Sequence, residues 1–317
     1  MKLLVTGGAG FIGANFVHYM LGNNPGLRIV NIDWLTYAGN LENLSGLEGD
    51  SRYTFHRADI RDGGSMDKIV ADEAPDAIVN FAAESHVDRS ITGPEVFVRT
   101  NVLGTLNLLE ASRKAGVKVF LQISTDEVYG TLGEDGFFTE SSPLQPNSPY
   151  AASKTGADHL VRAYHSTHGM DTRITRCSNN YGPYQFPEKL IPLMLTNAME
   201  GKELPVYGDG LQVRDWIYVT DHCRALELVL EKGCAGQVYN VGGVAQQTNL
   251  ETVCTILDAV GADHGLIRYV QDRPGHDRRY AIDSSKLQNE LGWKPEVEFP
   301  AGIAMTIQWY RDHQQWW

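Results

Sequence analysis

The sequence predicts an α/β fold, a doubly wound parallel sheet with a smaller lobe in the C-terminal half. Short apolar, β-branched runs alternate with helical patterns through the first half of the chain, which is typical of βαβ units. A glycine-rich turn over residues 7–13 joins the first of these runs to the first helical pattern. Glycine, proline and aromatic residues then become dense over residues 179–216, which favours binding loops and a small lobe over further sheet layers.

Hydrophobic periodicity places the individual elements. The expected strands of the first half are residues 2–6, 27–33, 53–58, 77–82, 117–124 and 172–177. Helical patterns lie between them, for example over residues 11–21 and 104–115. A helix over 216–229 and a strand over 236–241 are expected to rejoin the first sheet. We therefore expect one domain over residues 1–178, with about 216–241 rejoining it, and a lobe over 179–317.

Composition narrows the class of protein. The chain has 317 residues, of which 42% are hydrophobic and 21% charged, as in soluble globular proteins. The first apolar stretch runs directly into glycines, with no signal-peptide pattern, and no apolar run approaches the roughly 18 residues of a membrane span. We therefore expect a cytoplasmic protein with no membrane partner. The net charge of −12 disfavours nucleic acid as a partner, so a phosphate-bearing ligand needs arginines that collect locally.

The four cysteines are Cys177, Cys223, Cys234 and Cys254, and none forms a Cys-x-x-Cys pair. They indicate buried thiols in a reducing compartment rather than a zinc site, and we expect no metal.

The glycine-rich turn carries the pattern of a dinucleotide site. Gly7, Gly10 and Gly13 fit a fingerprint in which small residues let the backbone approach a pyrophosphate at a helix N-terminus. Asp33 ends the next expected strand, where a carboxylate binds the adenosine ribose hydroxyls. A 2′-phosphate beside this carboxylate would be repelled. The sequence therefore predicts a Rossmann-type domain that binds NAD rather than NADP.

Tyr150 and Lys154 are candidates for hydride chemistry. Ser148 and Pro149 precede them as a helix N-cap and first-turn residue, so the tyrosine and the lysine fall on one helical face. The ammonium and the positive nicotinamide of NAD would lower the tyrosine pKa, so that Tyr150 takes a proton from a sugar hydroxyl. A lone Tyr-x-x-x-Lys pair is common on helix surfaces. Together with the glycine fingerprint it resembles the extended short-chain dehydrogenase/reductase family, which includes epimerases, dehydratases and reductases of nucleotide sugars.

Two adjacent carboxylates separate these activities. Asp126 and Glu127 follow Thr125 at the end of an expected strand, where ligands of such folds bind. A 4-epimerase oxidises and reduces one carbon only, whereas loss of water needs a further base and acid. Two neighbouring carboxyl groups supply both when their surroundings push their pKa values apart.

This run is similar to that of the dTDP-glucose 4,6-dehydratases. The stretches that carry the resemblance are Leu35-Thr36-Tyr37-Ala38-Gly39-Asn40, Ala82-Ala83-Glu84-Ser85-His86-Val87-Asp88-Arg89-Ser90, Cys177-Ser178-Asn179-Asn180-Tyr181-Gly182-Pro183-Tyr184 and Arg273-Pro274-Gly275-His276-Asp277-Arg278-Arg279-Tyr280. The resemblance implies that Tyr150, aided by Lys154 and Thr125, deprotonates the C4 hydroxyl while hydride passes to NAD. It further implies that Glu127 removes the C5 proton and Asp126 protonates the departing C6 hydroxyl, before hydride returns to C6.

The same resemblance implies the binding residues. Those expected to hold NAD are Gly7, Gly10, Phe11, Ile12, Gly13, Asp33, Leu35, Thr36, Asp59, Ile60, Phe81, Ala82, Ala83, Ser85, Thr100, Tyr150, Lys154 and Asn180. Those expected to hold the nucleotide sugar are Ser85, Thr125, Asn179, Lys189, Leu190, Pro205, Tyr207, Arg214, Asn249, Arg273 and His276. The two arginines suit a diphosphate by their fork geometry, and Tyr207 suits stacking on the base. Stacking discriminates bases poorly, so thymidine comes from the resemblance alone.

Two other functions stay open at this point. A nucleotide-sugar 4-epimerase is disfavoured by the two carboxylates, and a non-catalytic NAD-binding regulator by the intact Tyr150 and Lys154. The resemblance also implies a homodimer packed through the helices that start near Gly104 and Tyr150. Arg278 and Arg279 are expected to be structural, and the closing pair Trp316-Trp317 has no functional explanation in the sequence.

Overall fold

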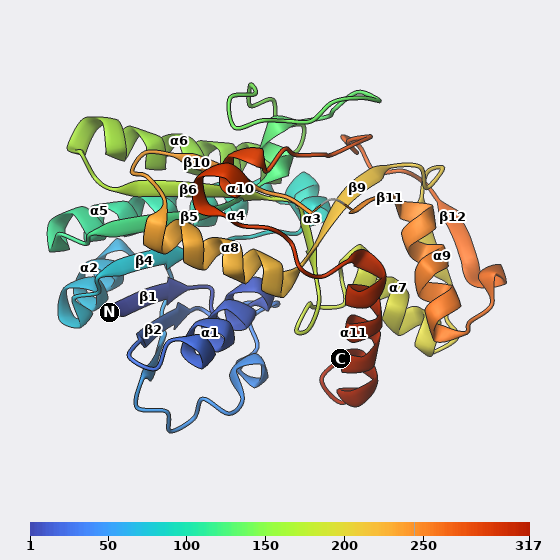
Figure 1. The fold of residues 1–317 in the computed structure, drawn as a ribbon, viewed down its shortest axis with the longest axis horizontal. Helices are drawn as coiled ribbons and strands as arrows, with labels where there is room; N and C mark the ends of the chain where they lie inside the picture. The colour runs from blue at the N-terminus through green and yellow to red at the C-terminus, as the bar shows by residue number, and fades with distance from the viewer. Residues whose placement is uncertain (244) are drawn as a thin grey trace.

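The central element of the computed structural model is a seven-stranded sheet in which every pairing is parallel (Figure 1). The structure describes residues 1–243 and 245–317. The strands are β1 (Lys2–Thr6), β2 (Arg28–Asp33), β3 (Tyr53–Arg57), β4 (Ala77–Asn80), β5 (Val119–Thr125), β6 (Thr172–Cys177) and β10 (Val238–Val241). Their order is β10-β6-β5-β4-β1-β2-β3, so successive strands run outward in opposite directions from β1 and β4. This confirms the Rossmann-type fold and places the ligand crevice at the carboxyl ends of these two strands.

Helices cover both faces of this sheet. One face carries α1 (Phe11–Asn23) and α8 (Val219–Lys232), and the other carries α2 (Gly63–Glu73), α5 (Thr105–Ala115) and α6 (Pro149–His168). Successive residues of a strand face opposite sides, so Leu3 and Val5 enter the core under α1 while Leu4 enters the core under α5. The double wrapping explains why central strands such as β1 and β4 carry apolar residues on both faces.

Short helical segments lead from the sheet to the crevice. These are η1 (Leu41–Leu44), α3 (Val87–Thr92), α4 (Pro94–Phe97), the π-helix η2 (Val98–Gly104), which continues into α5, and η3 (Asp126–Tyr129). The segment α3 follows β4 and η3 follows β5, so both lie at the carboxyl edge of the sheet.

A second lobe lies on the right of Figure 1. Its two small sheets are β11-β9-β7 and β12-β8, from β7 (Asn179–Tyr181), β8 (Leu204–Tyr207), β9 (Val213–Tyr218), β11 (Ala245–Thr248) and β12 (Ile267–Val270). The helices α7 (Leu190–Met199), α9 (Asn249–Val260) and α11 (Phe299–Asp312) and the short η4 (His264–Leu266) complete it around a separate core.

Two expectations for this region are wrong. Residues 179–216 contain strands and a helix rather than mainly loops. The helix expected over 216–229 begins at Val219, because Trp216, Ile217 and Tyr218 form the end of β9. Trp216 pairs with Ala245 on one side and Asn179 on the other, so the pairing partners of β9 are distant in sequence.

The chain returns twice to the first core. The strand β10 pairs with β6, and α10 (Ser285–Leu291) packs against β10 and α8. Leu287 and Trp293 are fully buried in the core that α1 and α8 share. The domain boundary near residue 178 stays a prediction.

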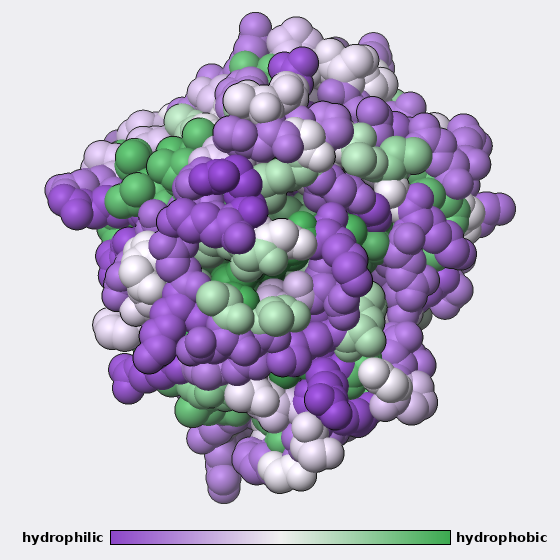
Figure 2. All heavy atoms as spheres, turned by 90° about the vertical axis from the view of Figure 1, so that its left-hand side faces the viewer, coloured by the Kyte–Doolittle hydropathy of each residue, from purple (hydrophilic) through white to green (hydrophobic). Residues whose placement is uncertain are grey.

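The face of the molecule on the left of Figure 1 is mostly hydrophilic, with small hydrophobic patches between the hydrophilic residues (Figure 2). None of the helices in the described part of the chain combines the length and apolarity that a membrane span needs. Cys177 and Cys223 are buried as expected, whereas Cys234 is exposed and Cys254 half-buried, so the expectation of four buried thiols is wrong for the latter two.

Candidate active site

A cavity of about 470 Å³ lies at the carboxyl edge of the large sheet and is walled by both lobes. It brings together nearly all the residues that the sequence assigned to a site. Those lining it are Gly7, Gly10, Phe11, Ile12, Gly13, Asp33, Thr36, Asp59, Ile60, Phe81, Ala82, Ala83, Ser85, Thr100, Thr125, Glu127, Tyr150, Lys154, Asn179, Asn180, Lys189, Leu190, Pro205, Tyr207, Arg214, Asn249, Arg273 and His276. The two exceptions are Leu35, whose side chain packs on the first core, and Asp126.

The glycine turn has the shape of a phosphate cradle. Gly7 has φ +70°, and a Cβ there would lie 2.7 Å from the backbone nitrogen of Ala82, so only glycine fits. Gly10 is the N-cap of α1 and supplies no side-chain cap, and the first turn of the helix has no acidic residue. The first N–H groups of α1 are therefore available to an anion.

Asp33 lines the cavity beside this turn. Its Oδ2 accepts the backbone N–H of Ala9 (3.0 Å) and its Oδ1 accepts that of Leu35 (2.8 Å). Burial raises the pKa of Asp33, and these two hydrogen bonds oppose the rise. Leu35 therefore serves the expected ribose site through its backbone, not its side chain. Cradle and carboxylate together fit a dinucleotide such as NAD.

Tyr150 and Lys154 lie on the first turns of α6. Ser148 caps this helix by accepting the N–H of Ala151 (3.1 Å), and Pro149 is its first residue. Lys154 is buried, and its Nζ donates to the carbonyl of Ile123 (2.7 Å) at the end of β5. This bond ties the helix to the strand that carries the carboxylates.

The pKa of Tyr150 moves in the direction opposite to the expected one. Among the protein's own groups burial is the largest influence and raises this pKa, Glu127 raises it further, and a hydrogen bond with Thr125 lowers it. Burial likewise lowers the pKa of Lys154. The expected lowering of the tyrosine pKa by Lys154 is absent, so a positive charge from a bound ligand would have to supply it.

Thr125, Asp126 and Glu127 form the turn at the end of β5. The hydroxyl of Thr125 donates to Asp126 Oδ1 (3.3 Å) and accepts the N–H of Glu127 (3.3 Å). Glu127 lines the cavity, whereas Asp126 is 1% exposed and lies behind the wall. Thr125 therefore connects a carboxyl group at the cavity to one beneath its surface.

The two carboxyl groups have different surroundings. Burial raises the pKa of Asp126 to about 8, and the charge of Glu127 adds to the rise. Burial also raises the pKa of Glu127, but three cations oppose this: Arg273, Lys189 and Arg214. Asp126 is thus protonated at neutral pH, while Glu127 faces the positive charge that favours its carboxylate form.

These cations come from three segments of the second lobe. Lys189 donates to the carbonyl of Ser85 (2.6 Å), and Arg214 donates to the carbonyls of Val213 (2.8 Å) and Asp277 (3.0 Å). The guanidinium of Arg214 also lies 4.5 Å from the centre of the Tyr280 ring. The acidic chain therefore gathers positive charge at this one cavity, as binding of a diphosphate requires.

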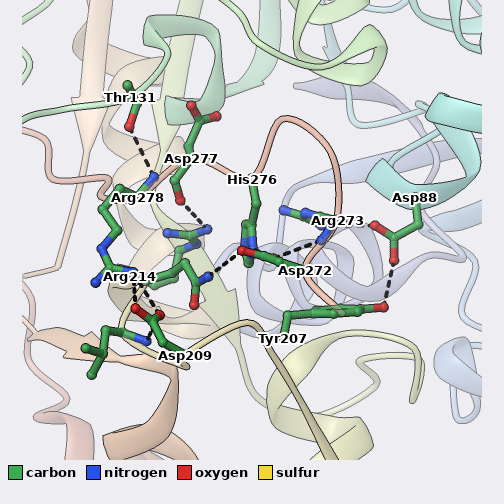
Figure 3. Close-up of polar contacts among 12 residues, drawn as sticks. Asp88, Thr131, Tyr207, Asp209, Arg214, Asp272, Arg273, His276, Asp277 and Arg278 are labelled. Carbon is green, nitrogen blue, oxygen red and sulfur yellow. Dashed lines mark hydrogen bonds and ion pairs between the residues drawn. The ribbon is translucent and has the colours of Figure 1, made fainter. Parts of the chain in front are cut away.

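Arg273 and the hydroxyl of Tyr207 lie beside Asp88 in the cavity lining (Figure 3). Arg273 Nη1 lies 3.3 Å from Asp88 Oδ1, and the Tyr207 hydroxyl donates to Asp88 Oδ2 (3.3 Å). His276 packs edge-on against Tyr207, and burial lowers its pKa to about 4, so it is neutral. Asp88 belongs to α3, so these contacts join the two lobes.

Several buried polar atoms at the cavity have no protein partner within the described residues. Asn179 Oδ1, Asn249 Oδ1 and Arg273 Nε belong to this group. Because an unpaired buried polar group is costly, their positions indicate a polar ligand. Arg278 points away and pairs with exposed Asp209 (2.8 Å). Buried Arg279 donates to the carbonyl of Gly136 (3.0 Å), so both arginines have structural contacts.

Sequence reasoning did not single out several cavity residues. They are Glu84, His86, Asp88, Glu188 and Tyr280. All except Glu188 lie within the stretches that carried the resemblance, so the signal was present but pointed to no individual role.

The chain is similar to known proteins over almost its whole length. The family model described as GDP-mannose 4,6 dehydratase matches residues 4–306. A dTDP-glucose 4,6-dehydratase of Xanthomonas campestris pv. campestris (strain B100) is 55% identical over an alignment of 331 residues. The match covers 99% of this chain and 94% of that protein.

Among solved structures, DesIV, a dTDP-glucose 4,6-dehydratase from Streptomyces venezuelae crystallised with NAD, is 53% identical with a TM-score of 0.97. That match covers 100% of this chain and 99% of DesIV. A UDP-glucose 4-epimerase from Thermotoga maritima, crystallised with UDP-glucose, has a TM-score of 0.92 at 31% identity, covering 99% of this chain and 100% of its own. The fold is therefore shared by both activities, and the higher identity is to the dehydratases.

Proposed function

Because the chain belongs to the family described as GDP-mannose 4,6 dehydratase, we propose that it is an NAD-dependent dehydratase of dTDP-glucose. It converts dTDP-glucose to dTDP-4-keto-6-deoxyglucose and water. The observation that carries this proposal is the pair of buried Asp126 and cavity-lining Glu127, joined through Thr125. Oxidation and reduction at C4 alone would need neither group.

The glycine turn and Asp33 hold the cofactor. The N–H groups at the start of α1 bind the pyrophosphate, and Asp33 binds the adenosine ribose. NAD held there would supply reversible hydride transfer between C4 and C6 of the sugar, so that no external reductant would be consumed.

Tyr150 is the base for the C4 hydroxyl. It is 8% exposed and faces the cavity from α6, and Thr125 lies within hydrogen-bonding reach of its hydroxyl. A phenolate is favoured when positive charge approaches, which couples proton removal to the oxidised state of the cofactor. Lys154 fixes the start of α6 against β5 through Ile123.

Glu127 and Asp126 then remove water. Glu127 takes the C5 proton, which the C4 ketone has made acidic. The protonated Asp126, with its pKa of about 8, gives a proton to the departing C6 hydroxyl. Glu127 returns its proton to C5 afterwards. Asp126 is behind the cavity wall, so Thr125 or a small shift of the turn links it to the substrate.

The second lobe binds the nucleotide. Arg214 and Arg273 contact the diphosphate together with Asn179, and Lys189, Leu190, Asn249 and His276 surround the rest of the nucleotide. Tyr207 and Pro205 lie against the base, and Ser85 and Thr125 lie against the sugar. The unpaired Asn179 Oδ1, Asn249 Oδ1 and Arg273 Nε support these assignments.

One experiment tests the reaction and the nucleotide together. The protein is incubated separately with dTDP-glucose, UDP-glucose and GDP-mannose without added reductant, and the products are identified by mass spectrometry and by NMR spectroscopy, which distinguishes a 4-epimer from unreacted substrate. We expect a 4-keto-6-deoxy product with loss of water from dTDP-glucose. A 4-epimer of unchanged mass would indicate an epimerase, and binding of NAD without turnover would indicate a regulator.

We also make proposals for the oligomeric state and the cellular location. We propose a homodimer packed through α5 and α6, and exposed Val98 and Leu103 on the preceding η2 support an apolar contact there. A monomeric sedimentation profile would contradict it. We also propose a domain boundary near residue 178. We further propose a cytoplasmic location, which is consistent with the free cysteines. Fractionation of cells checks the location.

A further inference from the structure

Residues 313–317 cross from the second lobe to the dinucleotide side of the molecule. Trp316 packs its ring edge-on against Trp309 of α11 (centroids 5.0 Å apart) and against Tyr310 (6.2 Å). Its indole Nε1 then donates to Asn43 Oδ1 at 2.8 Å. Asn43 belongs to η1, which follows β2 and the expected ribose carboxylate. The pair Trp316-Trp317, which the sequence did not explain, therefore has a polar contact to a segment next to the proposed cofactor site.

Asn43 is 1% exposed, and its side-chain oxygen, side-chain nitrogen and backbone carbonyl each have a hydrogen-bond partner. Its Nδ2 donates to the carbonyl of Ala9 (2.9 Å), and its own carbonyl lies 2.8 Å from His18 Nε2. An indole N–H only donates and a backbone carbonyl only accepts, so just one orientation of the Asn43 amide satisfies both. Trp316 therefore fixes which end of this amide faces Ala9.

Ala9 lies in the glycine turn itself. Its carbonyl accepts from Asn43 and from the backbone N–H of Asn40 (3.0 Å), and its N–H donates to Asp33 Oδ2 (3.0 Å). Asp33 lines the cavity, whereas Trp316 does not. A continuous set of hydrogen bonds thus runs from the second lobe to the carboxylate assigned to the ribose.

We infer that Trp316 is a positioning residue for the dinucleotide cofactor, acting through Asn43 on the glycine turn. This inference rests on the proposed NAD site. Without the indole N–H, Asn43 Oδ1 has no donor, and only the carbonyl of Ala9 still fixes the amide. The hydrogen bond from Asn43 to Ala9 is then held less firmly, and the turn that aligns Asp33 with the phosphate cradle loosens.

Trp317 offers a matched control next to Trp316. Both indoles are half-buried, and both donate one hydrogen bond. The Trp317 N–H donates to the carbonyl of Tyr310 (3.0 Å), within the same segment of the second lobe. Replacing either tryptophan by phenylalanine removes one N–H and keeps a ring, but only the Trp316 bond leads to the glycine turn.

The test compares Trp316→Phe with Trp317→Phe in the holoenzyme. Bound NAD is exchanged against excess NADH, and NADH fluorescence gives the rate at which NAD leaves. We expect release from Trp316→Phe to be roughly fivefold to tenfold faster than from wild type, since one buried hydrogen bond is lost. Release from Trp317→Phe stays within about twofold of wild type, as does the affinity of both variants for dTDP.

Two results would overturn the inference. Unchanged NAD release in Trp316→Phe would show that the contact does not reach the cofactor. Equal acceleration in Trp317→Phe, with a matching fall in unfolding temperature, would show general loosening of the segment instead. A wild-type protein that holds no NAD would refute the proposed function itself, so the two failures are distinguishable.

Asn43 gives a second route if Trp316→Phe folds poorly. Asn43→Asp keeps an acceptor for the indole but places a carboxylate oxygen against the carbonyl of Ala9. We expect faster NAD release from this variant with Trp316 intact. The double variant Asn43→Ala with Trp316→Phe should release NAD no faster than Asn43→Ala alone, because both changes break the same path. Additive effects in the double variant would contradict the inference.

Discussion

Thr125 donates its hydroxyl to Asp126 across 3.3 Å, and of these two residues only the threonine lies on the cavity wall. Asp126 is therefore kept out of water, which raises its pKa to about 8, while a polar contact still joins it to the reacting side. Glu127, one residue further, faces the cations of the cavity. A single turn at the end of β5 thus provides an acid and a base.

Replacing both carboxyl groups should separate oxidation from loss of water. In the double variant Asp126→Asn with Glu127→Gln, we expect dTDP-glucose still to reduce the bound cofactor, because Tyr150 and Lys154 are intact. Formation of the 4-keto-6-deoxy product should fall by about 10³-fold or more, since an acid and a base are both lost. Absorbance of the reduced cofactor and mass spectrometry measure the two steps. Tyr150→Phe is the comparison, in which cofactor reduction itself fails; an unimpaired double variant would refute the assigned roles.

The dehydration step should fall as the pH rises through about 8. Asp126 gives up a proton, so it is active only below its raised pKa, and each pH unit above that value should lower the rate by about tenfold. Rapid-quench measurement of product formation at saturating dTDP-glucose gives the profile. The oxidation step does not use Asp126 and serves as the internal control. A dehydration rate that stays constant well above this pH would show that Asp126 is not the acid.

Two arginines of one loop should differ strongly in their effect on substrate binding. Arg273→Ala should raise the KM for dTDP-glucose by about 10- to 100-fold, because a charge-assisted contact to the diphosphate is lost. Arg278→Ala removes the same charge from an exposed pair with Asp209 and should change KM by less than about threefold. Steady-state kinetics of both variants checks this. Equal effects would mean that net charge, not contact, attracts the substrate.

Asp33 should decide between NAD and NADP. Its half-buried carboxylate lines the cavity and would repel a 2′-phosphate, so wild type should bind NAD more tightly than NADP. Asp33→Ser should weaken the affinity for NAD by about tenfold and reduce the ratio of NAD to NADP affinity. The reason is that the ribose hydroxyls and the N–H of Ala9 both lose the carboxylate as a hydrogen-bond acceptor. Calorimetric titration with each nucleotide measures the ratio. Tighter binding of NADP by wild type would contradict the assignment.

The sequence predicts most where the determinants are local. The strands Lys2–Thr6 and Thr172–Cys177 have the expected bounds, because the first is an apolar run that ends at glycines and the second is rich in β-branched residues. The run Trp216–Ile217–Tyr218 is equally apolar, but its state depends on pairing with Asn179 and Ala245. That pairing has no local signature, so a helix was expected there.

The features of the site also differ in how far they could be predicted from the sequence. The cradle around Gly7 and the cap of α6 at Ser148 are built by neighbours in sequence and were predictable. The bridge from Asp88 to Arg273 and the bond from Trp316 to Asn43 join residues far apart in the chain. The sequence also does not show how deeply each carboxyl group is buried. Asp126 and Glu127 are adjacent in the chain, but only Glu127 lines the cavity.

The route of the chain through β10 has a consequence for how the molecule divides. β10 covers the outer side of β6, and in the chain it comes only after β7, α7, β8 and β9 of the second lobe. A fragment ending near residue 178 would leave β6 as a bare edge, with unpaired N–H and C=O groups ready to join another chain. The dinucleotide half is thus complete only in the full-length fold, so unfolding should occur as one cooperative event and shorter pieces should aggregate.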